Sequence, residues 1–297
     1  MPSLRAFAGV ARVPFLILSV TLVASGACAA AYEGHFSWPR TFVALVGLLA
    51  LHIAVNALNE WSDMRTGIDL QTERTPFSGG SGTLPAGSLS PGAALAFGLT
   101  CAAIGLAVGI WFLTRVGWVL LPFMIAGAVF VLGYTDAVAR VGLGEVAAGL
   151  GLGGLPVAGT ALVQNGSLEP AAIAAAVPAT FMTFNLLLLN EFPDEAADRL
   201  GGRRNLVILV GRPLAAVVYS AAAAATPVAI LAAVALKSLP VLCLAAVLPS
   251  LLLVKPLGWA LSRSREAVPV PALGANVAWN LTTNTVLAAT LALTTVL

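Results

Sequence analysis

Long apolar runs alternate with short polar segments along the whole chain. Each run holds about 20 mostly apolar residues, the length that an α-helix needs to cross the hydrocarbon core of a bilayer. The segments between the runs hold most of the charged residues and are rich in proline and glycine. The pattern predicts an all-α membrane protein with nine transmembrane helices. The expected spans are residues 11–32, 38–59, 91–112, 116–136, 142–164, 169–192, 212–236, 238–261 and 272–297.

The first run allows a second interpretation, because it follows Arg5 and Arg12 and contains a stretch of small residues at 24–29. These features are also typical of a cleaved signal peptide. The run is long enough to span a bilayer and eight more follow it, which favours a membrane helix.

The composition excludes a soluble globular protein. Hydrophobic residues make up 59% of the chain and charged residues only 9%, against about 25% charged residues in soluble domains. The net charge of +2 comes from scattered residues, so no nucleic acid partner is expected. Cys28, Cys101 and Cys243 lie in separate apolar segments, which predicts no disulfide framework.

The basic residues predict the orientation. Cytoplasmic loops of membrane proteins carry an excess of Lys and Arg, and 12 of the 15 basic residues fall on the side of the N-terminus. The other three, Arg40, Arg115 and Lys237, fall on the opposite side. We therefore expect a cytoplasmic N-terminus and a C-terminus outside.

The phrase Asn-Glu-x-x-Asp occurs twice, at residues 59–63 and 190–194, and a further acid follows each copy, Asp69 and Asp198. The copies end the second and sixth expected spans, four helices apart, and therefore lie on the same side of the membrane. Equivalent motifs in the same orientation indicate a parallel internal repeat. The active face is expected to be cytoplasmic.

Converging carboxylates repel one another unless a cation neutralises them. Oxygen ligands select Mg²⁺ or Ca²⁺, and Mg²⁺ is typically held by one or two carboxylates together with substrate phosphates. Arginines in the same loops could bind phosphate oxygens directly. The alternative, that these acids are solvated helix caps worth about 0–1 kcal/mol per ion pair, is weakened by the repetition of the phrase.

Two connections on this side, residues 60–90 and 193–211, are too long for simple turns. The first contains Ser-Gly-Gly-Ser-Gly at 78–82, and the second contains Gly-Gly-Arg-Arg at 201–204. Loops of this length in a compact membrane domain tend to be functional.

With these motifs the chain resembles the UbiA superfamily of intramembrane prenyltransferases, most closely its 1,4-dihydroxy-2-naphthoate polyprenyltransferase branch in menaquinone biosynthesis. The first motif is similar to the family's Asn-Asp-x-x-Asp with a later Gly and Asp, here Gly67 and Asp69. The second is similar to Asn-x-x-x-Asp-x-x-x-Asp, here Asn190, Asp194 and Asp198. The resemblance covers nearly the whole chain in family order.

The resemblance implies one prenyltransferase domain over residues 1–297, with nine helices around a central cavity and Mg²⁺ at a diphosphate site. It implies transfer of a prenyl group from a polyprenyl diphosphate to a small aromatic acceptor, in a prokaryotic plasma membrane. The implied metal ligands are Asn59, Asp63, Asp69, Asn190, Asp194 and Asp198. The implied diphosphate contacts are Arg12, Arg140, Arg203 and Arg204. Tyr134 would line the cavity near the reacting carbon, and Glu145 would orient the acceptor or pair with Arg140.

Three departures from the family pattern bear on the acceptor. Glu60 stands where the family usually has Asp, Asn205 stands where it usually has Thr, and the loop at 76–82 differs from that of typical naphthoate enzymes. A membrane terpene cyclase that acts on a prenyl diphosphate alone is therefore an alternative. A secondary transporter is an alternative from another class, although transport sites normally lie near the bilayer midplane.

Two polar stripes cross the expected spans. His52, Asn56 and Glu60 recur every four residues in the second span, and Asn276, Asn280 and Asn284 do so in the ninth. Either stripe could extend the site into the membrane. Hydrogen bonding between helices is the favoured interpretation of both.

Overall fold

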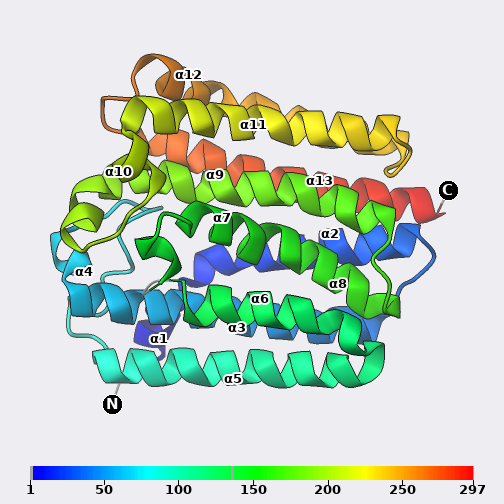
Figure 1. Cartoon of the computed structure of the whole chain (residues 1–297), viewed down its shortest axis with the longest axis horizontal. Helices are drawn as coiled ribbons and strands as arrows, with labels where there is room; N and C mark the ends of the chain where they lie inside the picture. Colours follow the sequence, from blue (N-terminus) through cyan, green and yellow to red (C-terminus); the bar gives the residue numbers. More distant parts are fainter. Residues whose placement is uncertain (1–2, 135–136, 297) are drawn as a thin grey trace.

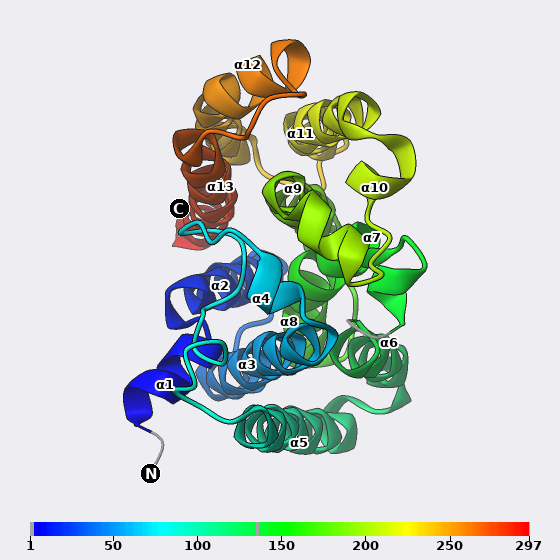
Figure 2. The same cartoon turned by 90° about the vertical axis from the view of Figure 1, so that its left-hand side faces the viewer.

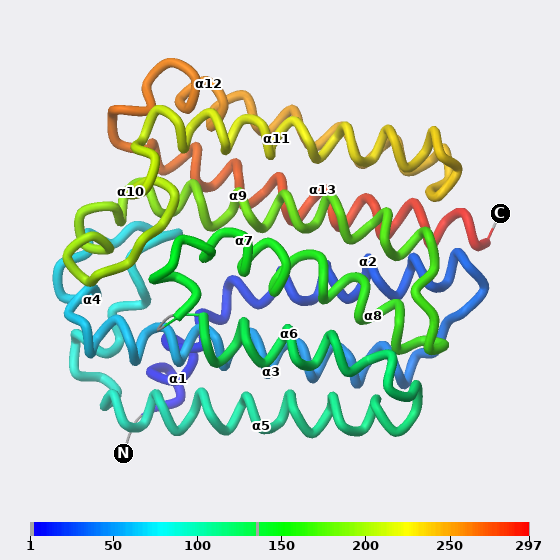
Figure 3. Tube along the Cα trace, viewed as in Figure 1, coloured from blue at the N-terminus to red at the C-terminus, as the bar shows by residue number. Residues whose placement is uncertain are grey.

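The computed structural model describes residues 3–134 and 137–296, and all the regular structure in these ranges is helical. The long helices run side by side in one elongated bundle (Figure 1). Figure 2 shows them arranged around the middle of the bundle, and the chain ends lie at opposite ends of it (Figure 3). The helices are α1 (Leu4–Val10), η1 (Val13–Leu16), α2 (Ile17–Tyr32), α3 (Trp38–Thr66), α4 (Ile68–Gln71), α5 (Pro91–Val116), η2 (Trp118–Leu120), α6 (Leu121–Leu132), η3 (Val138–Arg140), α7 (Gly144–Gly149), η4 (Leu150–Gly154), α8 (Leu155–Asn165), α9 (Pro170–Leu200), α10 (Leu206–Val210), α11 (Arg212–Ala235), η5 (Val241–Leu253), α12 (Val254–Ser262) and α13 (Val270–Val296).

Seven helical segments of the described residues are long and apolar enough to cross a membrane. They are Val13–Tyr32, Trp38–Thr66, Pro91–Val116, Gly144–Asn165, Pro170–Leu200, Arg212–Ala235 and Val241–Ser262. The expected fourth span contains a shorter apolar helical segment, Trp118–Leu132. The expected ninth is helix α13, whose Asn and Thr residues lower its mean hydropathy.

Two helices continue further than the apolar runs that predicted them. Helix α3 extends to Thr66, where Gly67 adopts the left-handed conformation (φ +80°) and ends it. Helix α9 continues through Pro193 to Leu200, although proline removes a backbone hydrogen bond and usually kinks or ends a helix. Both acid motifs are therefore built on rigid helix ends and not on loops.

Small residues allow the inner helices to approach closely. A Cβ atom added at Gly153 would lie 2.5 Å from the carbonyl oxygen of Ala179, so η4 packs directly on the backbone of α9. The buried core between α2, α8 and α9 is rich in alanine for the same reason. Such packing replaces the hydrophobic driving force that is absent within a bilayer, and it holds the walls of the site in place.

Candidate active site

A cavity of about 430 Å³ extends from the α4–α10 end of the bundle toward its middle. Its polar end combines both acid motifs with Arg12, Tyr134 and Arg203. Its apolar part is lined by residues of α2, α3, α6, η4, α9 and α13, among them Leu18, Leu48, Leu51, Val55, Phe130, Val131, Leu152, Leu186 and Leu281. The cavity can therefore bind a molecule with a charged head and a long apolar chain.

Arg203 joins the two acid motifs. Its guanidinium donates to Asp63, to Asn59 Oδ1 at 2.9 Å and to Asp198 Oδ1 at 3.1 Å. Asn205 adds a bond from Nδ2 to the other oxygen of Asp198 at 2.9 Å. Burial lowers the pKa of Arg203, but the two carboxylates outweigh it and hold that pKa above its usual value. The prediction that both motifs meet at one site agrees with this geometry.

The glycine-rich loop (residues 76–82) lies against the remaining acids of both motifs. The backbone N–H of Gly79 donates to Asp194, and a Cβ at Gly80 would lie 2.6 Å from Asp69 Oδ1. Both glycines have positive φ angles, +82° and +73°, which side chains other than glycine adopt only at a cost. Glycine is therefore required where the loop meets the carboxylates.

These acids fit Mg²⁺ held jointly with phosphate oxygens. Asp69 Oδ2 and Asp194 Oδ1 are buried without a hydrogen-bond partner, and buried polar atoms normally have one. Within the described residues no three acidic, His or Cys side chains are grouped closely enough to hold a bare ion. Mg²⁺ commonly takes one or two carboxylates and completes its shell with phosphate and water, which matches this donor set.

Glu60 holds the glycine-rich loop in place instead of facing the cavity. Its fully buried carboxylate accepts hydrogen bonds of 2.6 Å from both the N–H and the hydroxyl of Ser81. It also pairs with Arg12 Nε at 3.1 Å. Arg12 has a left-handed backbone (φ +51°) between α1 and η1. The longer side chain that replaces the family's usual Asp thus connects the N-terminal segment, α3 and the loop.

Replacing Glu60 with alanine is expected to destabilise the protein by about 2–4 kcal/mol, because the Ser81 N–H and the Arg12 guanidinium lose their buried partner. The change should appear as a lower midpoint of thermal unfolding in detergent. Glu73→Ala, in the same connection but exposed, is the matched control and should leave the midpoint unchanged. Equal midpoints for the two variants would contradict the role given to Glu60.

Asp69 is expected to make stability depend on pH. Burial, and then the neighbouring Asp63 and Glu60, raise its pKa from 3.8 to about 7. Because the folded protein then holds this proton more tightly than the unfolded chain does, the Asp69 contribution to the free energy of unfolding is complete below pH 3.8. It is lost as the pH rises through 7, by up to about 4 kcal/mol. In metal-free buffer Asp69→Asn should therefore be more stable than the unaltered protein at pH 8 but not at pH 4. A difference in unfolding midpoint that is the same at both pH values would refute this assignment.

Both polar stripes join helices, as favoured from the sequence. His52 Nδ1 lies 2.9 Å from Ser19 Oγ, and Asn56 donates to the carbonyl of Ala11 at 2.9 Å. Asn276 accepts from the hydroxyl of Tyr219 at 2.9 Å. The side chains of the first stripe therefore already have partners in the protein.

Three predicted site residues do not line the cavity. Arg204 is exposed, and the Arg140 guanidinium lies beside the backbone of Gly202. The cavity wall includes neither of these predicted diphosphate contacts. Glu145 is buried and accepts from the N–H of Leu206 at 2.5 Å, and its carboxyl group lies near that of Glu191. Its contacts are with α9 and the start of α10, because α7 packs along α9 at this level.

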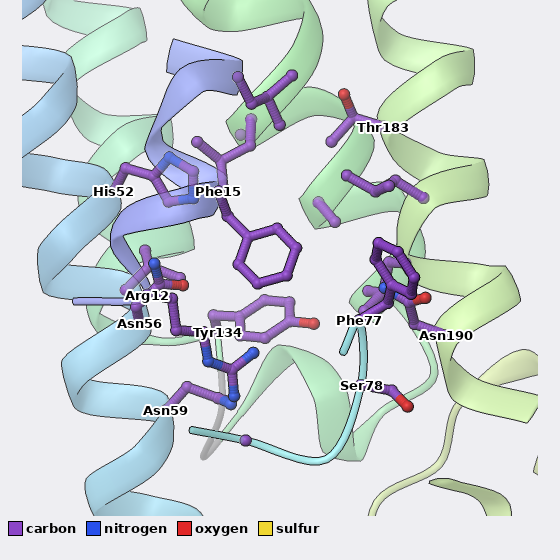
Figure 4. A pocket seen from close by; sticks show the side chains of 18 of the residues that line it. Arg12, Phe15, His52, Asn56, Asn59, Phe77, Ser78, Tyr134, Thr183 and Asn190 are labelled. Carbon is purple, nitrogen blue, oxygen red and sulfur yellow. The ribbon is translucent and has the colours of Figure 1, made fainter. Parts of the chain in front are cut away.

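Among the cavity residues that sequence reasoning missed are two aromatic residues at its polar end. Phe15 and Phe77 place their rings in the cavity, with Tyr134 beside Phe15 (Figure 4). The only signal for Phe77 was the unusual loop that contains it. Nothing in the apolar sequence around Phe15 distinguishes it from a lipid-facing residue.

The family of the chain follows from comparison with known proteins. The model of the UbiA prenyltransferase family matches residues 17–281. Because the match covers most of the sequence, the chain belongs to the UbiA prenyltransferase family. With seven membrane-capable helices in its described part, it is an integral membrane protein.

One curated relative is 1,4-dihydroxy-2-naphthoate octaprenyltransferase of Bacillus subtilis (strain 168), which is 25% identical over 170 residues. The alignment covers 56% of this chain and 53% of the relative. The chain therefore matches about half the length of that protein.

Solved structures share the fold. The apo structure of a UbiA homolog from Aeropyrum pernix K1 gives a TM-score of 0.69 at 18% identity, over 91% of this chain and 96% of that one. A UbiA homolog from Archaeoglobus fulgidus bound to DMAPP and Mg²⁺ gives 0.61 at 16% identity, over 95% and 99%. At these identities the similarity extends to the fold alone.

Proposed function

We propose that this protein transfers a prenyl group from a polyprenyl diphosphate to a small aromatic acceptor, in an Mg²⁺-dependent reaction. The observation that carries the proposal is the meeting of both acid motifs and Arg203 at the charged end of a long apolar cavity. The acceptor that we favour is 1,4-dihydroxy-2-naphthoate, in menaquinone biosynthesis. It is supported by the name of the B. subtilis relative, and the ligands of the A. fulgidus homolog support the donor and the metal.

We also propose a single domain over residues 1–297 with nine membrane spans, in a prokaryotic plasma membrane. The segment Trp118–Leu132 and helix α13 would supply the two spans beyond the seven. The excess of basic residues near the N-terminus supports a cytoplasmic N-terminus, and Figure 1 draws that end of the chain on the α4 side of the bundle. The active site would then face the cytoplasm.

In this reaction the two acid motifs hold the diphosphate from opposite sides. Asn59, Asp63 and Asp69 would act from α3 and α4, and Asn190, Asp194 and Asp198 would act from α9. Bound Mg²⁺ would supply Lewis-acid neutralisation of the departing diphosphate. Arg203 and Arg12, which both line the cavity, would donate hydrogen bonds to phosphate oxygens as their negative charge grows.

The rest of the chain protects and orients the reacting carbon. The apolar walls exclude water, which would otherwise capture the allylic cation that forms at C1 of the prenyl chain. Tyr134 lies in the polar half of the cavity, where its ring can face that carbon. An electron-rich carbon of the acceptor ring then forms the new bond, and the ring loses a proton.

The test is incubation of purified protein with a radiolabelled prenyl diphosphate and a panel of aromatic acids, with Mg²⁺ or with a chelator. We expect a prenylated lipid only when both the metal and an aromatic acid are present. A hydrocarbon product formed without any acceptor would identify a cyclase. The absence of diphosphate release under every condition would refute prenyl-diphosphate chemistry altogether.

A further inference from the structure

The two sides of the cavity differ in the polar groups that they offer to a ligand. On the side of α2 and α3, His52, Asn56 and Arg12 are bonded to Ser19, to the Ala11 carbonyl and to Glu60. On the side of α9 and α13, the hydroxyl of Thr183 accepts from Asn280 Nδ2 at 3.3 Å. Within the described part of the chain no bond donated by that hydroxyl is found, so its proton is available to a ligand.

Phe77 adds an aromatic ring to the same side of the cavity. Its ring is half-buried against the cluster built by α9, α11 and α13, and its Cζ would lie 3.2 Å from a Cβ added at Gly274. Figure 4 shows Phe77 near Asn190, on the same side of the cavity as Thr183 and across it from His52 and Asn56. The absence of a side chain at Gly274 makes room for the ring.

The loop that carries Phe77 is closed by a local turn and held to α3 and α9 at two points. The Thr75 hydroxyl accepts from the N–H of Ser78 at 2.9 Å and closes a turn, Ser81 is bonded to Glu60, and Gly79 is bonded to Asp194. Phe77 lies within the turn, two residues before the first of these anchors. A fixed aromatic ring contributes contact area at little cost in conformational entropy.

We propose that Phe77, Thr183 and Asn280 form the subsite for the acceptor, a planar aromatic ring with a hydroxyl or carboxylate substituent. The ring would stack on or against Phe77, and its polar substituent would accept from the Thr183 hydroxyl or bond to the Asn280 amide. The prenyl chain would lie in the apolar part of the cavity, along Phe130 and Leu51. This assignment rests on the proposed function and adds where the second substrate binds.

The position of the subsite also suits the reaction. Asn190 and Asp194 are one helical turn apart on α9, so a ring bound beside Phe77 and Asn190 lies next to the carboxylates that hold the diphosphate. The carbon of the prenyl chain that reacts is the one attached to that diphosphate. An acceptor in this place would therefore lie close to that carbon.

The test is calorimetric titration of the detergent-solubilised full chain with 1-hydroxy-2-naphthoate, and separately with geranyl diphosphate and Mg²⁺. Phe77→Ala should weaken hydroxynaphthoate binding about tenfold and change geranyl diphosphate binding less than twofold. Thr183→Val, which keeps the shape of the side chain, should weaken hydroxynaphthoate binding about fivefold. Phe130→Ala is the matched aromatic control in the apolar part of the cavity, and it should weaken only geranyl diphosphate binding.

The naphthoate titration contains no prenyl diphosphate, so its outcome does not depend on turnover. The proposed function fails if the unaltered protein releases no diphosphate. The subsite fails if the unaltered protein does not bind hydroxynaphthoate, if Phe77→Ala and Thr183→Val bind it normally, or if Phe77→Ala weakens both ligands equally.

Discussion

Asp194→Asn is expected to reduce Mg²⁺-dependent diphosphate release at least a hundredfold. One oxygen of Asp194 accepts from Gly79, and the other is buried without a partner and lies on the cavity wall. Asparagine keeps the size of the side chain but removes the negative charge that a metal-diphosphate requires. Losing one electrostatic contact to a developing charge commonly costs about 10²–10³-fold in kcat. Release of labelled diphosphate at saturating Mg²⁺ measures the effect.

The matched control is Glu195→Gln. Glu195 is the next acid on α9, but it pairs with Arg199 and Arg212 and is not part of the cavity wall. The Glu195→Gln variant should retain nearly full activity, whereas Asp63→Asn should behave like Asp194→Asn. Both site variants should elute as single monodisperse peaks in detergent. Near-normal turnover in Asp63→Asn and Asp194→Asn would refute the assignment of these carboxylates to the diphosphate site.

Arg203→Ala should lower both activity and stability, with a loss of about 3–5 kcal/mol in the free energy of unfolding. The guanidinium is only 17% exposed and pairs with two buried carboxylates, so its removal leaves two unpaired negative charges close together. Lysine should rescue the stability only in part, because a single ammonium cannot reproduce the planar fork that reaches Asn59, Asp63 and Asp198 together. Chemical or thermal unfolding in detergent is the measurement.

A double variant separates this pairing from a general disturbance. Asp198→Asn removes one of the unpaired charges, so the double variant Arg203→Ala with Asp198→Asn should be more stable than Arg203→Ala alone. Arg204→Ala replaces the neighbouring, exposed arginine and should leave the unfolding midpoint nearly unchanged. If Arg204→Ala were as destabilising as Arg203→Ala, the pairing at Arg203 would not explain the loss.

The tertiary structure revised what the unusual residues of this chain do. From the sequence, Glu60 was a departure from the family motif that put the acceptor in doubt. In the structure it is the anchor of the glycine-rich loop. The loop in turn brings Gly79 to Asp194 and Phe77 to the cavity. A single longer side chain therefore connects the charged end of the site to the wall proposed for the acceptor.

The sequence by itself determined the membrane-embedded helical class and seven of the spans, and it singled out the two acid motifs as the candidate site. These features are local, because the length of an apolar run and the spacing of acids on a helix can be read without knowing what packs against them. The expected spans ended at 59 and 192, because hydropathy falls at the acid motifs, while the helices continue to Thr66 and Leu200.

Only the tertiary structure decided how these parts meet. The bonds from Arg203 to Asp63 and from Ser81 to Glu60 join residues 140 and 21 positions apart, and no pattern along the chain encodes such pairings. They arise because the packing of the whole bundle fixes where the ends of α3 and α9 lie. The loops then close across those ends, and buried polar groups must find partners there or leave an oxygen free for a ligand.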